Sequence, residues 1–203
     1  KGPDFVEHDL REKAAAAGIE LPPFQTEFLE SKNWLKENVI KFAPVEVEDF
    51  IIYGIHEKDI PPSDKVTLRI YAATAFGSEH QTTKSCLRAI SHLNRLGAAH
   101  RNILDMGTGS GILALAAAKL WPDAARITAV DIDPEAVAVT RQNARDNHLE
   151  KYLTVAVSNG YNSDLVQNNA PYDIIIANIL ARPLIEMAPQ LNQALAPGGF
   201  CIL

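Results

Sequence analysis

The stretch that most constrains the fold covers residues 101–134, RNILDMGTGSGILALAAAKLWPDAARITAVDIDP. Its pattern is a short apolar strand from Asn102 to Met106, a glycine-rich turn, a helix beginning near Ile112 and a second strand from Ile127 to Val130. Such alternation is typical of a parallel α/β sheet, which binds nucleotide-like ligands beyond the carboxyl ends of its strands.

The glycine-rich turn and two aspartates form a candidate cofactor site. Asp105 stands two residues before Gly107-Thr108-Gly109-Ser110-Gly111. Glycine permits a tight turn and lets a ligand lie against bare peptide N–H groups at the start of a helix. We therefore expect Asp105, Gly107 and Gly109 to form part of a cofactor site. Asp131, at the carboxyl end of the second strand, is expected to accept the hydroxyl hydrogens of a ribose.

The spacing of the glycines separates two cofactor classes. A dinucleotide fingerprint is G-x-G-x-x-G, whereas this chain has G-x-G-x-G with an acid two residues earlier. The pattern disfavours a nicotinamide-dependent dehydrogenase and resembles the first motif of the class I S-adenosylmethionine-dependent methyltransferases. The glycines by themselves also suit a purely structural turn, but their order with Asp105 and Asp131 favours a binding site.

The remaining pattern predicts an α/β fold, a Rossmann-like doubly wound sheet that is mainly parallel. Asp133-Pro134-Glu135 is a strong helix start with a capping aspartate. A fourth strand ends just before Asn178, so Gly107, Asp131 and Asn178 should meet at one edge of the sheet. The other expected elements are a helix ending near Asn147, a strand from Tyr152 to Val157, a polar loop over 158–171, a strand from Tyr172 to Ala177, a further helix, a turn at 197–199 and a fifth strand from Phe200.

The residues before this region suggest a separate part of the chain. A short helix from Phe5 to Ala17 is stopped by Gly18, and residues 1–30 are too few to bury a core of their own. A linker helix is expected over 31–44. A hairpin of two strands, Val45 to Gly54 and Lys65 to Tyr71, then leads into the α/β domain, 45–203.

Composition narrows the possible partners. The 203 residues carry a formal net charge of −6, so binding of nucleic acid by bulk electrostatics is not expected. No apolar run is long enough to span a membrane. Cys86 and Cys201 are far apart, and the six histidines are scattered. We therefore expect no metal site, and the cysteine usage fits a cytoplasmic protein.

A second polar segment could reach the cofactor. A helix running to about Leu96 begins near Thr82 and Thr83. One interpretation is that a threonine hydroxyl caps this helix. The other is that the hydroxyl and the first N–H groups of the helix bind a carboxylate of the cofactor, and the two are compatible.

Four segments together resemble the ribosomal protein L11 methyltransferase family (PrmA). They are Ala75 to Leu87, Asp105 to Ala114, Val130 to Pro134 and the run Asn178-Ile179-Leu180-Ala181 with Ala177 before it. The resemblance implies a Rossmann-like domain that binds S-adenosylmethionine and a smaller α+β N-terminal domain that holds the basic substrate protein. Residues 1–30 would be a remnant of that recognition domain, and 45–203 would be a methyltransferase domain truncated after its fifth strand.

The resemblance also assigns residues. By motif position, Thr83, Gly107, Asp131 and Asn178 would contact the cofactor, and the substrate would be an amine of ribosomal protein L11, on a lysine side chain or at the N-terminus. Amide and base methyltransferases carry Asn-Pro-Pro-Tyr where this chain has Asn-Ile-Leu-Ala.

We expect the Asn178 oxygen to accept amine hydrogens and aim the lone pair at the methyl group. The structural alternative is that Asn178 caps the following helix. His80 and Glu79 are weaker candidates for a general base. Methylation of a glutamine amide, RNA or a small molecule, and a non-catalytic cofactor-binding module, remain alternative functions.

Overall fold

The computed structural model describes residues 3–24, 43–58, 60–71, 81–97, 101–124 and 126–203. By its internal contacts the chain divides into two compact units, residues 1–34 and 35–203. The first unit contains helix α1, Pro3–Ala16. The helix ends before Gly18, whose φ of 67° is left-handed and suits a residue without Cβ. The predicted N-terminal helix is thus confirmed, whereas the predicted linker helix lies almost entirely outside the described residues.

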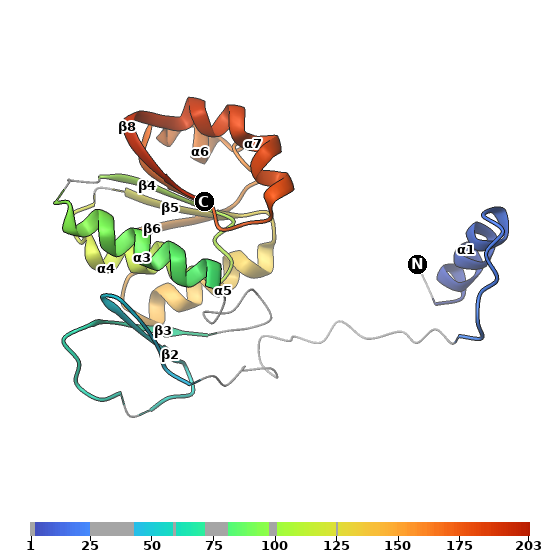
Figure 1. Ribbon diagram of the computed structural model, residues 1–203, viewed down its shortest axis with the longest axis horizontal. Coiled ribbons are helices and arrows are strands. Elements are labelled where there is room, and N and C mark those ends of the chain that lie inside the picture. The colour runs from blue at the N-terminus through green and yellow to red at the C-terminus, as the bar shows by residue number, and fades with distance from the viewer. Residues whose placement is uncertain (1–2, 25–42, 59, 72–80, 98–100, 125) are drawn as a thin grey trace. The chain divides into compact units, whose positions relative to one another are not determined.

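A five-stranded sheet forms the centre of the second unit (Figure 1). Its strand order is β6-β5-β4-β7-β8, and each neighbouring pair runs parallel. The predicted mainly parallel sheet is therefore confirmed. The strands are β4 (Asn102–Met106), β5 (Arg126–Asp131), β6 (Leu153–Val157), β7 (Tyr172–Ile176) and β8 (Leu195–Ile202).

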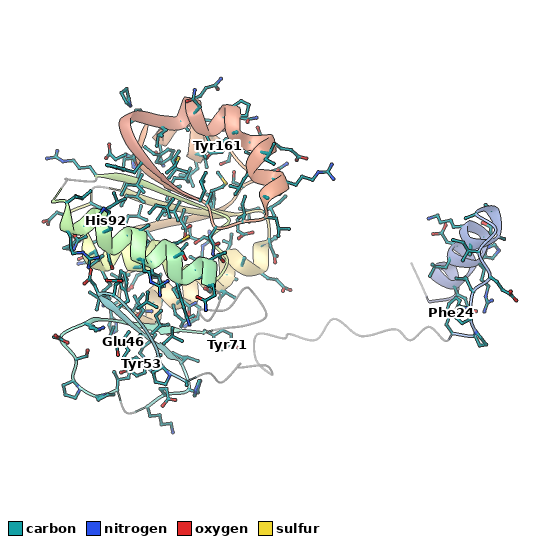
Figure 2. The ribbon with its side chains drawn as sticks, viewed as in Figure 1. Phe24, Glu46, Tyr53, Tyr71, His92 and Tyr161 are labelled. Carbon is teal, nitrogen blue, oxygen red and sulfur yellow. The ribbon has the colours of Figure 1, made fainter. Side chains whose placement is uncertain are left out.

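Helices cover both faces of this sheet, as the doubly wound prediction requires (Figure 1). Successive strand residues point to opposite faces, so Ile103 and Leu104 enter different core clusters. The first cluster includes residues of α3 and α4. The second includes residues of α6 and α7, and also Tyr161, which precedes α6 (Figure 2). The helices are α3 (Gln81–Arg95), α4 (Ile112–Leu120), α5 (Pro134–Asp146), α6 (Asp164–Asn169) and α7 (Ala181–Ala194).

A smaller sheet, in the order β1-β2-β3, precedes the large one. Its strands are Val45–Val47, Phe50–Gly54 and Val66–Ile70. The predicted hairpin between the segments 45–54 and 65–71 is wrong. The hairpin lies within 45–54, where Glu48 takes a φ of 48° in the turn between β1 and β2. The residues after β2 carry the chain back to the start of that strand, so β3 pairs with it in parallel.

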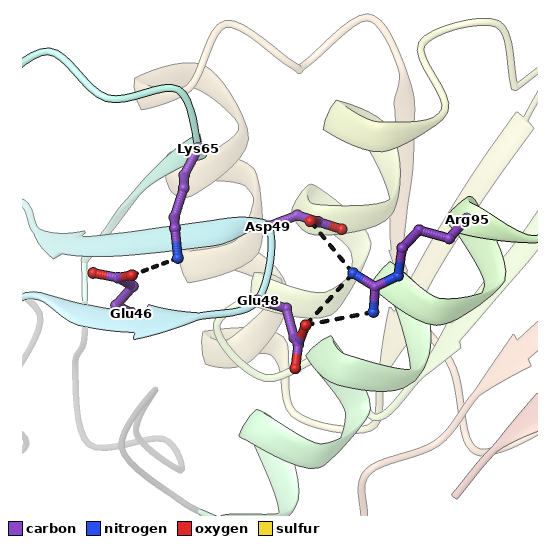
Figure 3. A network of polar contacts seen from close by, with 5 residues as sticks. All are labelled: Glu46, Glu48, Asp49, Lys65 and Arg95. Carbon is purple, nitrogen blue, oxygen red and sulfur yellow. Dashed lines mark hydrogen bonds and ion pairs between the residues drawn. The ribbon is translucent and has the colours of Figure 1, made fainter.

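Exposed ion pairs join strands of the small sheet to each other and to α3 (Figure 3). The Arg95 guanidinium of α3 lies 3.4 Å from the Glu48 carboxylate and 3.5 Å from that of Asp49. Lys65 pairs with Glu46 next to them. Because water screens these side chains, each pair contributes at most about 1 kcal/mol to stability.

Two elements near the C-terminal end of the chain differ from expectation. The predicted polar loop over 158–171 contains the short helix α6, capped by Ser163, whose Oγ accepts a hydrogen bond from the Val166 N–H. Strand β8 begins at Leu195 rather than Phe200. In the pairing with β7, Tyr172 lies opposite Leu195. The register then shifts, so that Ile174 lies opposite Phe200.

Candidate functional site

The predicted site residues lie at one edge of the large sheet. Gly107 directly follows β4, Asp131 ends β5, and Asn178 lies two residues beyond β7. These three strands are neighbours and run parallel, so their carboxyl ends meet. The connection changes direction between β4 and β7, which is where ligands of such sheets bind.

The glycine-rich turn offers fewer bare N–H groups than the sequence suggested. Four of its N–H groups already donate within the protein. Gly107 N and Thr108 N donate to the Val130 oxygen at 2.8 and 2.9 Å, Gly109 N donates to Asp131 Oδ2 at 2.9 Å, and Gly111 N donates to the Thr108 oxygen at 2.8 Å. Binding a pyrophosphate requires free N–H donors. A ligand without phosphates depends more on close contact with the backbone of the turn. The turn therefore suits a ligand without phosphates.

The first two glycines of the turn have different surroundings. Gly107 has a φ of 72°, and a Cβ there would lie 2.2 Å from Cγ2 of Ile179. Gly109 has a φ of 56°, and a Cβ there would meet nothing within 4 Å. The protein itself thus packs against Gly107, while Gly109 borders open space that a ligand can enter.

The Asp131 carboxylate accepts two hydrogen bonds within the protein and can accept further ones from a ligand. Its Oδ2 accepts from Gly109 N, and its Oδ1 accepts from Asp133 N at 3.0 Å. Each carboxylate oxygen has a second lone pair, so both can still accept a ribose hydroxyl. The carboxylate therefore links the turn to the expected ribose position.

Asp133 has the capping role that the sequence predicted. Its Oδ1 accepts from Glu135 N at 2.9 Å, and Pro134 opens α5. Replacing Asp133 with alanine is expected to lower the free energy of unfolding by about 1 kcal/mol. Affinity for the expected cofactor should not change. Denaturant unfolding and a cofactor titration test the two parts, and a fall in cofactor affinity would contradict this division of roles.

Asp105 is buried beneath the turn, with 1% of its surface exposed. Its Oδ2 accepts from the Thr108 hydroxyl at 2.7 Å and from Ala114 N, in the first turn of α4, at 3.1 Å. Burial raises the pKa of this carboxyl from 3.8 to about 6, although both hydrogen bonds act to lower it. The observed contacts hold the turn in shape, and direct contact with a cofactor stays a prediction.

The raised pKa predicts a pH dependence of stability. Between pH 4 and 6 the folded state binds the Asp105 proton more tightly than the unfolded state, so stability falls as pH rises through this window and is level above it. The shift corresponds to about 3 kcal/mol. Unfolding measured at pH 4, 5, 6 and 7 should show this fall in the wild type relative to Asp105→Asn. A constant difference between the two proteins would contradict the prediction.

Thr83 and Asn178 contact each other directly. The Asn178 Nδ2 donates to the Thr83 Oγ1 at 3.0 Å, and Thr83 is buried. Because the amide donor is committed to Thr83, the Oδ1 is the atom left to accept from a ligand. The capping alternatives are wrong: Leu180 is the N-cap of α7, and Thr82 and Thr83 lie inside α3. His80 and Glu79 lie outside the described residues.

Sequence reasoning missed three further residues at this edge. Ile132, between the two aspartates, is 66% exposed and offers an apolar surface beside Asp131. Its position in Val130-Asp131-Ile132-Asp133 was the available signal. Thr140 and Asn143 of α5 donate to carbonyl oxygens of the turn. Buried polar residues on a helix give no such signal in the sequence.

The described ranges contain neither a metal-binding cluster nor a membrane-spanning helix. No group of three or more histidine, cysteine, aspartate or glutamate residues there is arranged to hold a metal ion. None of the helices described is long and apolar enough to cross a membrane.

The sequence is similar to one protein family over nearly its whole length. The family model for ribosomal protein L11 methyltransferase (PrmA) matches residues 5–203. A ribosomal protein L11 methyltransferase of Rhizobium meliloti is 43% identical over 182 residues, which are 89% of this chain and 62% of the relative. One from Brucella suis (strain ATCC 23445 / NCTC 10510) is 40% identical over 98% of this chain and 70% of the relative. The chain thus spans about three fifths of the Rhizobium relative's length.

A solved structure shows the same fold. The crystal structure of ribosomal protein L11 methylase from Lactobacillus delbrueckii subsp. bulgaricus aligns with a TM-score of 0.63 and 31% sequence identity. The alignment covers 79% of this chain and 78% of that one. With the family model matching nearly the whole chain, the chain belongs to the ribosomal protein L11 methyltransferase (PrmA) family.

Proposed function

We propose that this protein transfers methyl groups from S-adenosylmethionine to amino groups of ribosomal protein L11, on lysine side chains or at the N-terminus. The observation that carries the proposal is the Asn178–Thr83 hydrogen bond at the sheet edge that also holds the glycine-rich turn and Asp131. Membership of the family and the names of the relatives support the reaction and the substrate.

The residues at the edge fit S-adenosylmethionine better than a dinucleotide. This cofactor has a ribose and an adenine but no phosphate, which agrees with a turn whose N–H groups are largely occupied. Asp131 would accept the ribose hydroxyls, Ile132 would contact the adenine, and the open side of Gly109 would let the nucleoside approach. When bound, the sulfonium supplies an electrophilic methyl group.

The protein's part in the chemistry is to orient an amine. A lysine ammonium has no lone pair, and removing its proton at neutral pH costs about 4 to 5 kcal/mol, given an ordinary pKa near 10.4. Asn178 Oδ1 would accept a hydrogen of the neutral amine and hold the nitrogen in line with the methyl group. Thr83 accepts from the amide nitrogen of Asn178, which would leave the amide oxygen to face the substrate.

We assign the two parts of the chain different roles within this proposal. Residues 1–30 belong to the part that recognises the substrate, and 45–203 form the part that binds the cofactor. L11, free or on the large ribosomal subunit, is the partner, which places the reaction in the cytoplasm.

Calorimetric titration tests the cofactor assignment. We expect S-adenosylmethionine to bind with one site per chain and NAD⁺ to give no heat of binding. Binding of NAD⁺ in place of S-adenosylmethionine would contradict the proposal.

A further inference from the structure

Three polar side chains, two in α5 and one directly after it, are buried although helix residues of these types usually face water. Thr140 and Asn143 are 0% exposed, and Asn147, which follows α5, is 6% exposed. They are spaced three and four residues apart, so they share one face. Burying a polar group is costly unless it is hydrogen-bonded, and the partners of these three side chains show what the face does.

Two of the side chains hold the glycine-rich turn. The Thr140 hydroxyl donates to the Gly109 oxygen at 2.9 Å, and Asn143 Nδ2 donates to the Ser110 oxygen at 2.8 Å. A Cβ at Gly111 would lie 2.8 Å from Thr140 Cγ2, so the helix also packs closely on the end of the turn. Side chains of α5 thus hold the middle of the turn through the turn's own carbonyl groups. On the side of β5, the turn is held by the bond of Gly109 N to Asp131.

The two asparagines also pair with the backbone of β3 and of the residue after it, as a neighbouring strand would. Asn143 Oδ1 accepts from Tyr71 N at 2.7 Å, and its Nδ2 donates to the Tyr71 oxygen at 3.3 Å. Asn147 makes the same pair of bonds to Arg69, at 2.9 and 2.7 Å. Figure 2 shows Tyr71 where β3 ends. The small sheet is therefore joined to α5 by two matched amides, of which Asn143 also reaches the turn.

We infer that Thr140 and Asn143 are positioning residues for cofactor binding, because they fix the turn so that Gly109 N stays on the ribose-binding Asp131. The inference rests on the proposed binding of S-adenosylmethionine at this turn. Without the bonds to the carbonyls of Gly109 and Ser110, the turn can rotate its peptides and move the Asp131 carboxylate with it. Asn147 docks the same strand without touching the turn, so it is a matched control.

The test compares Asn143→Ala with Asn147→Ala in the whole protein. We expect Asn143→Ala to raise Kd and KM for S-adenosylmethionine about tenfold more than Asn147→Ala does, the effect of one lost hydrogen bond. Turnover at saturating cofactor should stay close to that of the Asn147 variant. A merely structural role would lower the active fraction, and hence kcat, in both variants without changing KM.

A second variant covers the case in which Asn143→Ala does not fold. Thr140→Val keeps the shape of the side chain and removes its bond to the Gly109 oxygen, so Kd for S-adenosylmethionine should rise several-fold, as for one weakened hydrogen bond. This inference alone is overturned if Asn143→Ala and Asn147→Ala bind S-adenosylmethionine with equal affinity. If Asn143→Ala does not fold, the inference is overturned when Thr140→Val binds S-adenosylmethionine as tightly as the wild type. Failure of the wild type to bind S-adenosylmethionine overturns both the inference and the proposed function.

Discussion

Replacing Asn178 with alanine is expected to lower kcat for methyl transfer about 100-fold, the scale of loss when a reacting group is no longer held in position. The Asn178 Oδ1 is the acceptor that would orient the amine, and its amide is held by Thr83 at 3.0 Å. Affinity for S-adenosylmethionine should fall by less than kcat does, since Asn178 is one of several expected cofactor contacts and the turn and Asp131 remain in place. Single-turnover rates at saturating cofactor and substrate measure the effect on the chemical step.

A variant of the partner residue refines this test. Thr83→Val leaves the amide of Asn178 present but removes the oxygen that accepts from it. The amide can then rotate, so kcat should fall, but by less than in Asn178→Ala. Unchanged turnover of Asn178→Ala at saturating cofactor would remove Asn178 from the catalytic site.

Replacing Asp131 with alanine is expected to raise Kd for S-adenosylmethionine at least about 100-fold. Two hydrogen bonds from ribose hydroxyls to a carboxylate are lost, each worth about 1.5 to 3 kcal/mol. The variant also removes the acceptor of Gly109 N, which loosens the turn. Calorimetric titration, or competition where binding is too weak for calorimetry, measures the change.

Asp133→Ala is the matched control for this variant. The two aspartates lie two residues apart and carry the same charge, but Asp133 caps α5. A purely electrostatic effect of acids on the cationic cofactor would weaken binding in both variants. Equal losses would therefore refute a specific ribose contact by Asp131, whereas a loss confined to Asp131→Ala supports it.

The large sheet was predictable because its three central strands, β4, β5 and β7, are buried on both faces. Continuous apolar runs such as residues 174–176 of β7 identify such strands locally. The parallel pairing of β2 and β3 was not predictable, since it depends on the path of the residues between them. The helix α6 was missed because six residues carry little periodicity, although Ser163 was an available capping signal.

The place where the candidate site residues meet was predictable, but the hydrogen bonds there and some of the residues that make them were not. Gly107, Asp131 and Asn178 follow from their positions at strand ends, which a parallel fold brings together. The occupation of the turn's N–H groups depends on the Val130 carbonyl of a neighbouring strand. Likewise, Asn143 has the sequence environment of a solvated helix residue and is buried because β3 packs beside it.

The most direct test of the proposed function is methyl transfer from labelled S-adenosylmethionine to purified ribosomal protein L11, followed by mass spectrometry of the product. We expect the label on lysine side chains or the N-terminal amine of L11, and a loss of about 100-fold in rate with Asn178→Ala. Absence of label on L11, or label on glutamine amides or on RNA offered in parallel, would contradict the proposed function.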